Sequence, residues 1–289
     1  MLTPVSRRLV VQGIGSPCVE CAPDAPGLAA EEAVVFIHGN PGSSEDWRAL
    51  VDHVGRFARA LAVDMPGFGQ ADKPDDFGYT VAGYARHLES LLAALGVTRV
   101  HLVLHDFGGA WGLAWAARNP ARVASVSLFN IGILPGYRWH FMARLWRTPL
   151  LGELVQASTT EFGFRQLLKI GNPRGLPSDF VARMYRDYDK GTRRAVLRLY
   201  RATGPEEVER FSADVLAALR PHQIPAVVIW GQRDIFIPSR YAEVQREVFP
   251  DLRTVMLADS GHWAFADNPS ACADALGGFL RRQFLSTTP

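Results

Sequence analysis

The stretch Val100–Ala110, with the sequence VHLVLHDFGGA, decides the fold. An apolar run of strand length leads directly into a helix-like segment, with Asp106 at the junction and Gly108 and Gly109 just after it. A strand that turns sharply into a helix holds the side chain at the turn above the C-terminal edge of a sheet, and the glycines let the helix approach closely. The stretch therefore predicts a carboxylate presented at a strand-to-helix turn.

Similar apolar runs occur on both sides of this stretch, and helix-length segments of 3.6-residue periodicity separate them. Runs that are almost continuously apolar predict buried strands, here near Ala33–Ile37, Arg59–Val63, Val100–His105, Val123–Phe129, Ala226–Trp230 and Arg253–Leu257. Helices are expected at Thr80–Leu95, stopping at Gly96, and at Gly108–Asn119, ending before Pro120. This alternation predicts an α/β fold with a mostly parallel central sheet and helices on both faces.

The alternation stops in the middle of the chain. Between Ile133 and roughly Phe211 the strand pattern disappears, and several helical stretches rich in Trp, Tyr and Arg follow one another. We therefore expect an inserted helical lid at residues 133–211, between core parts at residues 1–132 and 212–289.

The composition is that of an ordinary globular protein, with 289 residues, 48% of them hydrophobic and 21% charged. The 31 Lys and Arg against 29 Asp and Glu leave a net charge of +2, which is too small to predict a nucleic-acid or membrane partner. No apolar run approaches the length of a spanning helix, and the run Leu9–Val11 is too short for a signal-peptide core. We expect a soluble, cytoplasmic protein of open oligomeric state.

The three cysteines do not predict a disulfide framework. Cys18 and Cys21 have the spacing of a redox or zinc site, but no second Cys or His pair follows, and Pro23 and Pro26 occupy the place of the helix that a redox site needs. The pair is interpreted as two thiols in a strand of an N-terminal hairpin. No trio of histidines suggests a metal, and no cofactor is expected.

Two more polar residues follow strands near the C-terminus. Asp234 follows the run Ala226–Trp230, and His262 follows the next run, so the chain order is Asp106, acid, histidine. Loops at the ends of parallel strands bring such residues together. A carboxylate at a helix start is ionised near neutral pH and can attack carbon without first losing a proton to a base. Attack on saturated carbon is favoured, since an ester or amide would give a labile anhydride.

The segment His38–Gly42 follows the run Ala33–Ile37 and has the form of an oxyanion loop. The backbone N–H groups of Asn40 and Phe107 are expected to hold the oxygen that becomes charged when a covalent ester is hydrolysed. His38 is interpreted as a structural brace of this loop. The side-chain amide of Asn40 is a candidate donor to a leaving group.

These residues resemble the aspartate-nucleophile branch of the α/β-hydrolase family, which contains epoxide hydrolases and haloalkane dehalogenases. The resemblance covers nearly the whole chain outside the lid, and five strings carry it: His38-Gly-Asn-Pro-Gly-Ser-Ser, Asp64-Met-Pro-Gly-Phe-Gly, Asp72-Lys-Pro, His105-Asp-x-Gly-Gly and Gly261-His-Trp. It implies an α/β-hydrolase fold and an alkyl-enzyme ester on Asp106. His262, oriented by Asp234, would then activate the water that hydrolyses the ester.

Within this branch, Asn40 resembles the haloalkane dehalogenases. In those enzymes an Asn at this position and a Trp directly after the aspartate bind the departing halide together. Phe107 stands in place of that Trp and has no N–H to donate. The second donor is therefore missing unless Trp139 or Trp146 of the lid supplies it.

Epoxide opening instead needs an acid for the developing alkoxide, which lid tyrosines supply in the epoxide hydrolases. Tyr200 resembles one of them, and Tyr137 at the lid entrance is the candidate for the other. An epoxide hydrolase is therefore the leading hypothesis. The alternatives are a haloalkane dehalogenase and a catalytically silent ligand-binding protein of the same fold.

Aromatic residues near these positions bear on the substrate. Trp139 and Trp146 of the lid, with Trp263 beside His262, indicate a largely apolar pocket for a small organic substrate. The other interpretation is that these side chains pack against the core.

Overall fold

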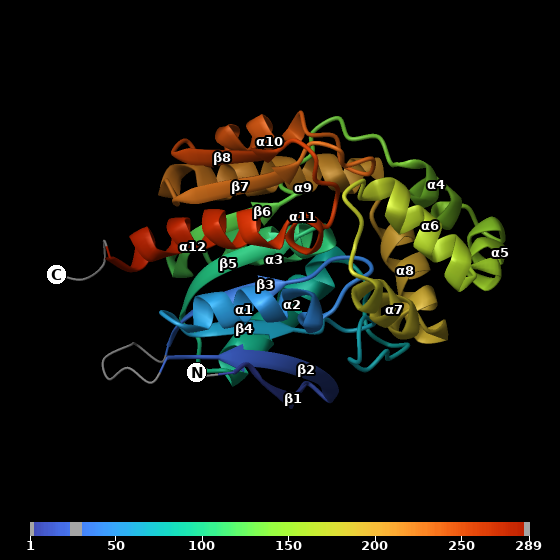
Figure 1. Cartoon of the computed structure of the whole chain (residues 1–289), viewed down its shortest axis with the longest axis horizontal. Coiled ribbons are helices and arrows are strands. Elements are labelled where there is room, and N and C mark those ends of the chain that lie inside the picture. The colour runs from blue at the N-terminus through green and yellow to red at the C-terminus, as the bar shows by residue number, and fades with distance from the viewer. Residues whose placement is uncertain (1–2, 24–30, 286–289) are drawn as a thin grey trace.

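The computed structural model describes residues 3–23 and 31–285, and within them the chain forms one eight-stranded sheet (Figure 1). The strands are β1 (Val5–Val11), β2 (Ile14–Cys21), β3 (Glu32–Ile37), β4 (Ala60–Val63), β5 (Arg99–His105), β6 (Val123–Phe129), β7 (Ala226–Gly231) and β8 (Leu252–Leu257). Their order is β1-β2-β4-β3-β5-β6-β7-β8. The pairs β1–β2 and β2–β4 are antiparallel, and all the other pairs are parallel. The predicted α/β class is confirmed.

Helices cover both faces of this sheet. Those of the core are α1 (Arg48–Gly55), α2 (Val81–Ala94), α3 (Phe107–Arg118), α9 (Pro205–Leu219), α10 (Tyr241–Val244), α11 (Ala264–Asp267) and α12 (Pro269–Leu285), with short 3-10 turns at Ser44–Trp47, Pro120–Arg122, Arg220–His222 and Gln245–Glu247. Helix α1 packs against α12, and α3 packs against both α2 and α9. Figure 1 shows the first pair in front of the sheet.

The six predicted strands are confirmed to within about a residue, and so are the two predicted core helices. Helix α2 begins where the hydroxyl oxygen of Thr80 accepts a hydrogen bond from the Gly83 N–H, 3.0 Å away. It ends before Gly96, whose φ of +66° few other residues tolerate. Local side-chain chemistry therefore sets both ends of this helix.

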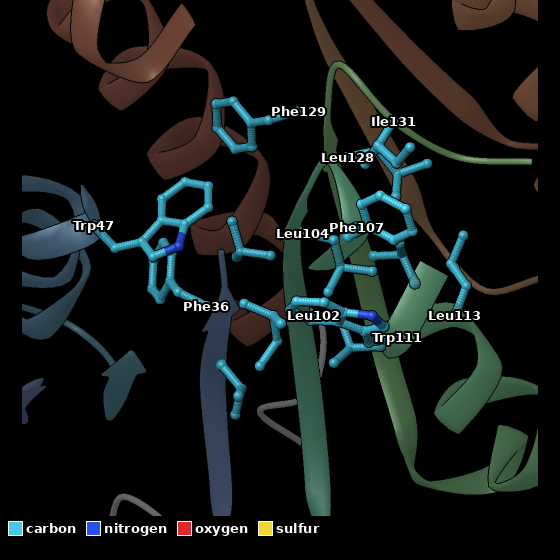
Figure 2. Packing of buried hydrophobic residues seen from close by; sticks show 14 of the residues in the cluster. Phe36, Trp47, Leu102, Leu104, Phe107, Trp111, Leu113, Leu128, Phe129 and Ile131 are labelled. Atoms are coloured by element: carbon cyan, nitrogen blue, oxygen red, sulfur yellow. The ribbon is translucent and has the colours of Figure 1, made fainter. Parts of the chain in front are cut away.

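The hydrophobic core lies on both sides of the central strands. Figure 2 shows Trp47 and Phe36 on one side of β3 and β5, and Trp111 and Leu113 on the other. All four side chains are fully buried. Burying one large apolar side chain contributes roughly 1.5–3 kcal/mol, so the middle of the sheet is a rigid support for residues at the ends of β3, β5 and β6.

Five helices of the expected lid lie together at one end of the sheet, at the right of Figure 1. They are α4 (Phe141–Arg147), α5 (Leu151–Ser158), α6 (Glu161–Gly171), α7 (Ser178–Asp187) and α8 (Lys190–Ala202). The guanidinium of Arg183 in α7 bonds to Asp46 at 2.8 Å and to the Ser43 hydroxyl at 2.7 Å, which ties the lid to the core. The expected boundary after residue 211 lies inside the continuous helix α9, which packs on α3 of the core.

The N-terminal hairpin is confirmed as well. Cys18 and Cys21 lie in β2 as free, buried thiols, and Cys272 is also free and buried in α12. Burial raises the pKa of the Cys18 thiol to about 12, so this thiol stays protonated and unreactive. None of the helices in the described part of the chain is both long and apolar enough to cross a membrane.

Candidate active site

Asp106 lies at the turn between β5 and α3, as the sequence predicts. Its φ of +49° is rare for a residue with a side chain, and strained backbone of this kind is concentrated at functional sites. The turn depends on glycines, because a Cβ atom at Gly108 would collide with the carbonyl oxygens of Ile37 and His38. A Cβ atom at Gly39 would collide with Asp106 itself.

The structure brings Asp106, His262 and Asp234 together from the ends of three elements. Nδ1 of His262 is 2.6 Å from Oδ2 of Asp234, which is a short, charge-assisted hydrogen bond. Nε2 of the same ring faces Oδ2 of Asp106 at 3.6 Å, beyond hydrogen-bond length. The imidazole is therefore held by one carboxylate and turned toward the other.

Both oxygens of the Asp234 carboxylate accept two hydrogen bonds each. Its Oδ1 accepts from the backbone N–H groups of Phe236 and Ile237 at 2.7 and 3.0 Å, and its Oδ2 accepts from Asn130 Nδ2 at 2.8 Å as well as from His262. Asn130 follows β6 with a φ of +50°, and its Oδ1 accepts from the Gly231 N–H. Asn130 is not among the residues predicted from the sequence, where its one local signal is its position directly after a predicted strand.

The charges of the three groups reinforce one another. Burial would raise the pKa of Asp106, but His262, His105 and the Asn40 N–H hold it well below its usual value. Burial would lower the pKa of His262, but the carboxylates of Asp234 and Asp106 raise it. The resting site is thus an ionised carboxylate beside an imidazolium. Converting Asp106 to an ester removes one of the two negative charges that hold the proton on His262, and so moves the imidazole toward its basic form.

Of the two backbone N–H groups expected to hold the carboxylate oxygen, one does so in the structure. The Asn40 backbone N–H donates to Oδ1 of Asp106 at 2.7 Å. His38 braces the loop, because its Nδ1 bonds to the Gly39 carbonyl at 2.8 Å and its Nε2 accepts from the Met65 N–H at 2.9 Å. No corresponding bond joins the Phe107 N–H to Asp106 among the described residues. Only Asn40 therefore holds that oxygen in this state.

Tyr200 in α8 reaches the site from the lid. Its hydroxyl is 3.4 Å from Nε2 of His140, and Nδ1 of His140 accepts from the Ala143 N–H at 3.2 Å. Burial lowers the pKa of His140 to about 4, so the ring is neutral and its one proton is on Nε2. That N–H points at the tyrosine oxygen, so the phenolic proton of Tyr200 is not used in this contact, and the side chain of Asn40 is a second polar group beside the hydroxyl. No role for His140 is predicted from the sequence.

Tyr137 is placed differently. Its hydroxyl donates to the carbonyl oxygen of Phe236 at 2.8 Å. The phenolic proton is therefore engaged with the backbone, although the ring still faces the cavity beside Asp106. Of the two expected acids, Tyr137 donates its proton to the backbone, whereas the Tyr200 hydroxyl lies beside the side chains of His140 and Asn40.

Three tryptophans surround this side of the site. The ring of Trp139 stacks on Phe107, with centroids 6.0 Å apart, and Trp146 lies 5.0 Å from Tyr200. Trp263 packs on His262 at 4.7 Å. The indole N–H groups of all three are buried without a partner among the described residues, and so is the side-chain amide of Asn40.

Two cavities meet at Asp106. The lid cavity, of about 260 Å³, is lined by Asn40, His262, Trp146 and Trp263 and by residues of α5 and α6. The helix cavity, of about 610 Å³, lies between α2, α3 and α9 and reaches Phe107, Tyr137 and Trp139. Asp106, His140, Tyr200 and Phe236 border both cavities. The carboxylate is thus accessible to a substrate from two directions.

This arrangement places an ionised carboxylate, an imidazole and a phenol around open space. The family model of the alpha/beta hydrolase fold matches residues 32–269. The chain belongs to the α/β-hydrolase fold family. Within residues 3–23 and 31–285, no cluster of three or more His, Cys, Asp or Glu side chains could hold a metal ion.

Two relatives of this α/β hydrolase match over most of their length. A haloalkane dehalogenase of Mesorhizobium japonicum is 30% identical over 267 residues, which cover 87% of this chain and 85% of the relative. A cis-3-alkyl-4-alkyloxetan-2-one decarboxylase of Xanthomonas campestris is 29% identical over 278 residues, which cover 89% of this chain and 90% of the relative.

The fold of this α/β hydrolase is also shared with a solved structure. The crystal structure of haloalkane dehalogenase DbeA from Bradyrhizobium elkani superimposes with a TM-score of 0.85 at 23% identity, over 98% of this chain and all of the other. The similarity to the Mesorhizobium relative makes the chain a hydrolase of the haloalkane dehalogenase type.

Proposed function

We propose that this α/β hydrolase converts an epoxide and water into a vicinal diol through a covalent ester on Asp106. A carboxylate oxygen of Asp106 attacks one ring carbon, and the bond from that carbon to the ring oxygen breaks. Tyr200 gives its proton to the alkoxide that forms. The product of this half-reaction is a hydroxyalkyl ester of Asp106 and a tyrosinate.

His262 drives the second half-reaction. The imidazolium of His262 first returns its proton to the tyrosinate of Tyr200, and the resulting neutral imidazole removes a proton from water, so that hydroxide attacks the ester carbonyl of Asp106. The Asn40 N–H, already 2.7 Å from Oδ1 of Asp106, stabilises the oxygen that becomes charged. The ester bond breaks, the proton brought to the Asp106 carboxyl by the attacking hydroxide passes to the departing alkoxide, the diol leaves, and His262 is again an imidazolium beside an ionised Asp106.

The phenol of Tyr200 beside Asp106 is the observation that carries this proposal. An alkoxide leaving group needs a proton, whereas a halide needs only hydrogen-bond donors. Burial and the nearby Asp106 carboxylate raise the pKa of Tyr200, so the phenol keeps its proton until a stronger base, such as an alkoxide, forms beside it. The name of the Xanthomonas relative, which contains a four-membered oxetan-2-one ring, also supports a strained ring C–O bond as the target.

A haloalkane dehalogenase is the second candidate. The unpartnered N–H groups of Asn40, Trp146 and Trp263 all border the lid cavity, and N–H donors of this kind suit a departing halide. The Mesorhizobium relative supports the same substrate class.

Trapping the ester tests the proposal. The His262→Gln variant cannot activate water, so intact-protein mass spectrometry should show the mass of one 1,2-epoxyheptane added to the chain. The double variant Asp106→Asn/His262→Gln should show no added mass. The unmodified enzyme should form heptane-1,2-diol faster than it releases bromide from 1-bromohexane. Rapid bromide release without any diol would reverse the ranking of the two candidates.

A further inference from the structure

The helix cavity and the lid cavity leave Asp106 in different directions. The helix cavity alone, at about 610 Å³, falls within the roughly 300–1,000 Å³ of ordinary small-molecule sites. The lid cavity, at about 260 Å³, is smaller. A substrate with its reactive carbon at one end would need only one of them.

The walls of the helix cavity are apolar. Ala110, Ala114 and Ala117 line it from α3, and their short side chains leave space that larger residues would fill. Val208 and Val215 of α9 face them and are buried. These five side chains offer no hydrogen-bond partner to a substrate, so this stretch of the cavity between α3 and α9 suits a hydrocarbon chain.

The helix cavity is open to solvent, and the charges that line it nearly cancel. Arg118 and Arg210 line it together with Glu207 and Asp214, and all four residues are exposed. Arg210 is 3.6 Å from Glu207. Because these two cations and two carboxylates balance, the lining does not select a charged end group.

The lid cavity has its own mouth on the other side of Asp106. Ser158, Thr160 and Gly163, at the junction of α5 and α6, line it and are exposed. Its inner wall carries Val155, Leu167 and Leu168, which are apolar as well. The nucleophile therefore lies in the middle of an apolar passage that is open at two ends.

We propose that the substrate is an internal epoxide with two unbranched, uncharged hydrocarbon arms, the longer of which occupies the helix cavity and the shorter the lid cavity. This inference rests on the proposed function for the identity of the reactive group. The two-armed shape rests on the cavities alone.

Equilibrium binding to the Asp106→Asn variant tests the shape without turnover. The two probes are cis-6,7-epoxydodecane, with two pentyl arms, and 1,2-epoxyheptane, with one. The two-armed probe should bind about tenfold more tightly or better, because each extra buried methylene adds apolar contact. Ala114→Phe, added to this variant, fills the helix cavity and should reduce that preference by about tenfold.

The matched control is Ala93→Phe, at an exposed position of α2 that lines neither cavity. It should leave the ratio of the two dissociation constants unchanged. Circular dichroism and the midpoint of thermal unfolding verify that all variants fold. Leu167→Trp, which narrows the lid cavity instead, gives a second measure and should also reduce the preference.

Equal binding of the two probes, no binding of either, or the same ratio in the Ala114→Phe and Ala93→Phe variants would each overturn the two-armed substrate. Failure of the proposed function is detected separately, by measuring diol formation with the unmodified enzyme. If that enzyme forms no diol from either epoxide while the binding ratio behaves as described, the epoxide chemistry is wrong and the two-armed shape stands.

Discussion

The sheet side of the active site, formed by Asp106, Asp234 and His262, differs from the lid side, formed by Tyr200, His140 and the nearby tryptophans. On the sheet side, Asp234 accepts four hydrogen bonds and holds His262 in place. On the lid side, three indole N–H groups have no acceptor among the described residues, and the Tyr200 hydroxyl lies beside the side chains of His140 and Asn40. The first side is organised before substrate arrives, whereas the second keeps its donors for a ligand.

This difference assigns separate tasks to the two sides. Groups that are already hydrogen-bonded cost no reorganisation during the reaction, which suits the nucleophile and the base. Buried donors without partners are costly in the free protein, and a substrate that supplies acceptors removes this cost. Changes on the sheet side should therefore affect all substrates alike, and changes on the lid side should depend on the leaving group.

The largest effect is expected for Asp106→Asn. An amide is a far poorer nucleophile than a carboxylate, so kcat should fall by on the order of 10⁴-fold or more with epoxides and bromoalkanes alike. Steady-state kinetics with 1,2-epoxyheptane and 1-bromohexane measures the loss. A loss with one substrate class only would contradict a common nucleophile.

Tyr200→Phe should distinguish the catalytic task of the lid side from that of the sheet side. The change removes the acid, so diol formation should fall by about 10²-fold, while any bromide release should change much less because a halide needs no proton. Tyr137→Phe is the matched control: its hydroxyl already bonds to the Phe236 carbonyl, so it should cost about 1 kcal/mol of stability and little turnover. Equal losses of diol formation in both variants would refute the assignment of Tyr200 as the acid.

Asn130→Ala tests whether the donors to Asp234 matter. The variant loses a hydrogen bond to a charged group and places alanine at a φ of +50°. The free energy of unfolding should fall by about 2–4 kcal/mol, and kcat by roughly tenfold. Urea unfolding measures the first effect.

Asn130→Gly provides the comparison for this variant, because glycine tolerates the backbone angle but also lacks the amide. Its free energy of unfolding should fall less than that of Asn130→Ala, and its kcat should fall by the same factor. A variant Asn130→Gly with full activity would show that the amide does not position Asp234.

The smallest effect is expected in the pH dependence of stability. Burial would lower the pKa of His262, but the charges of Asp234 and Asp106 raise it from 6.5 to about 10. A raised pKa contributes stability that is complete below pH 6.5 and is lost as the pH rises to about 10. Thermal unfolding of the enzyme should therefore shift to lower temperature over this interval, and less so in His262→Gln. Identical shifts in both proteins would contradict the charged resting state.

Much of the sheet side could be predicted from the sequence. Asp106, Asp234 and His262 each follow an almost continuously apolar run, and the carboxyl ends of parallel strands share one edge of a sheet. Their meeting in space therefore follows once the strands are identified. Asn130 was not predicted, because a single Asn after a strand carries no chemical motif of its own.

The lid side could not be predicted to the same depth. The partners of its polar groups are far away along the chain: Tyr200 meets His140 across 60 residues, and Tyr137 meets the Phe236 carbonyl across 99. Both tyrosines look alike as amphipathic residues of a helical insertion. Which of them donates its proton to the backbone depends on how α4 and α8 pack over the core.

The order of apolar runs, glycines and polar residues along this chain was enough to determine an α/β hydrolase with a carboxylate at a strand-to-helix turn, because each signal is local or repeats with the period of a strand or helix. The tertiary structure alone decided that the hydroxyl of Tyr137 is bonded to the backbone, that His140 lies beside the hydroxyl of Tyr200, and that two cavities open at Asp106. Space between helices depends on side chains from several distant segments at once, and no local pattern records it.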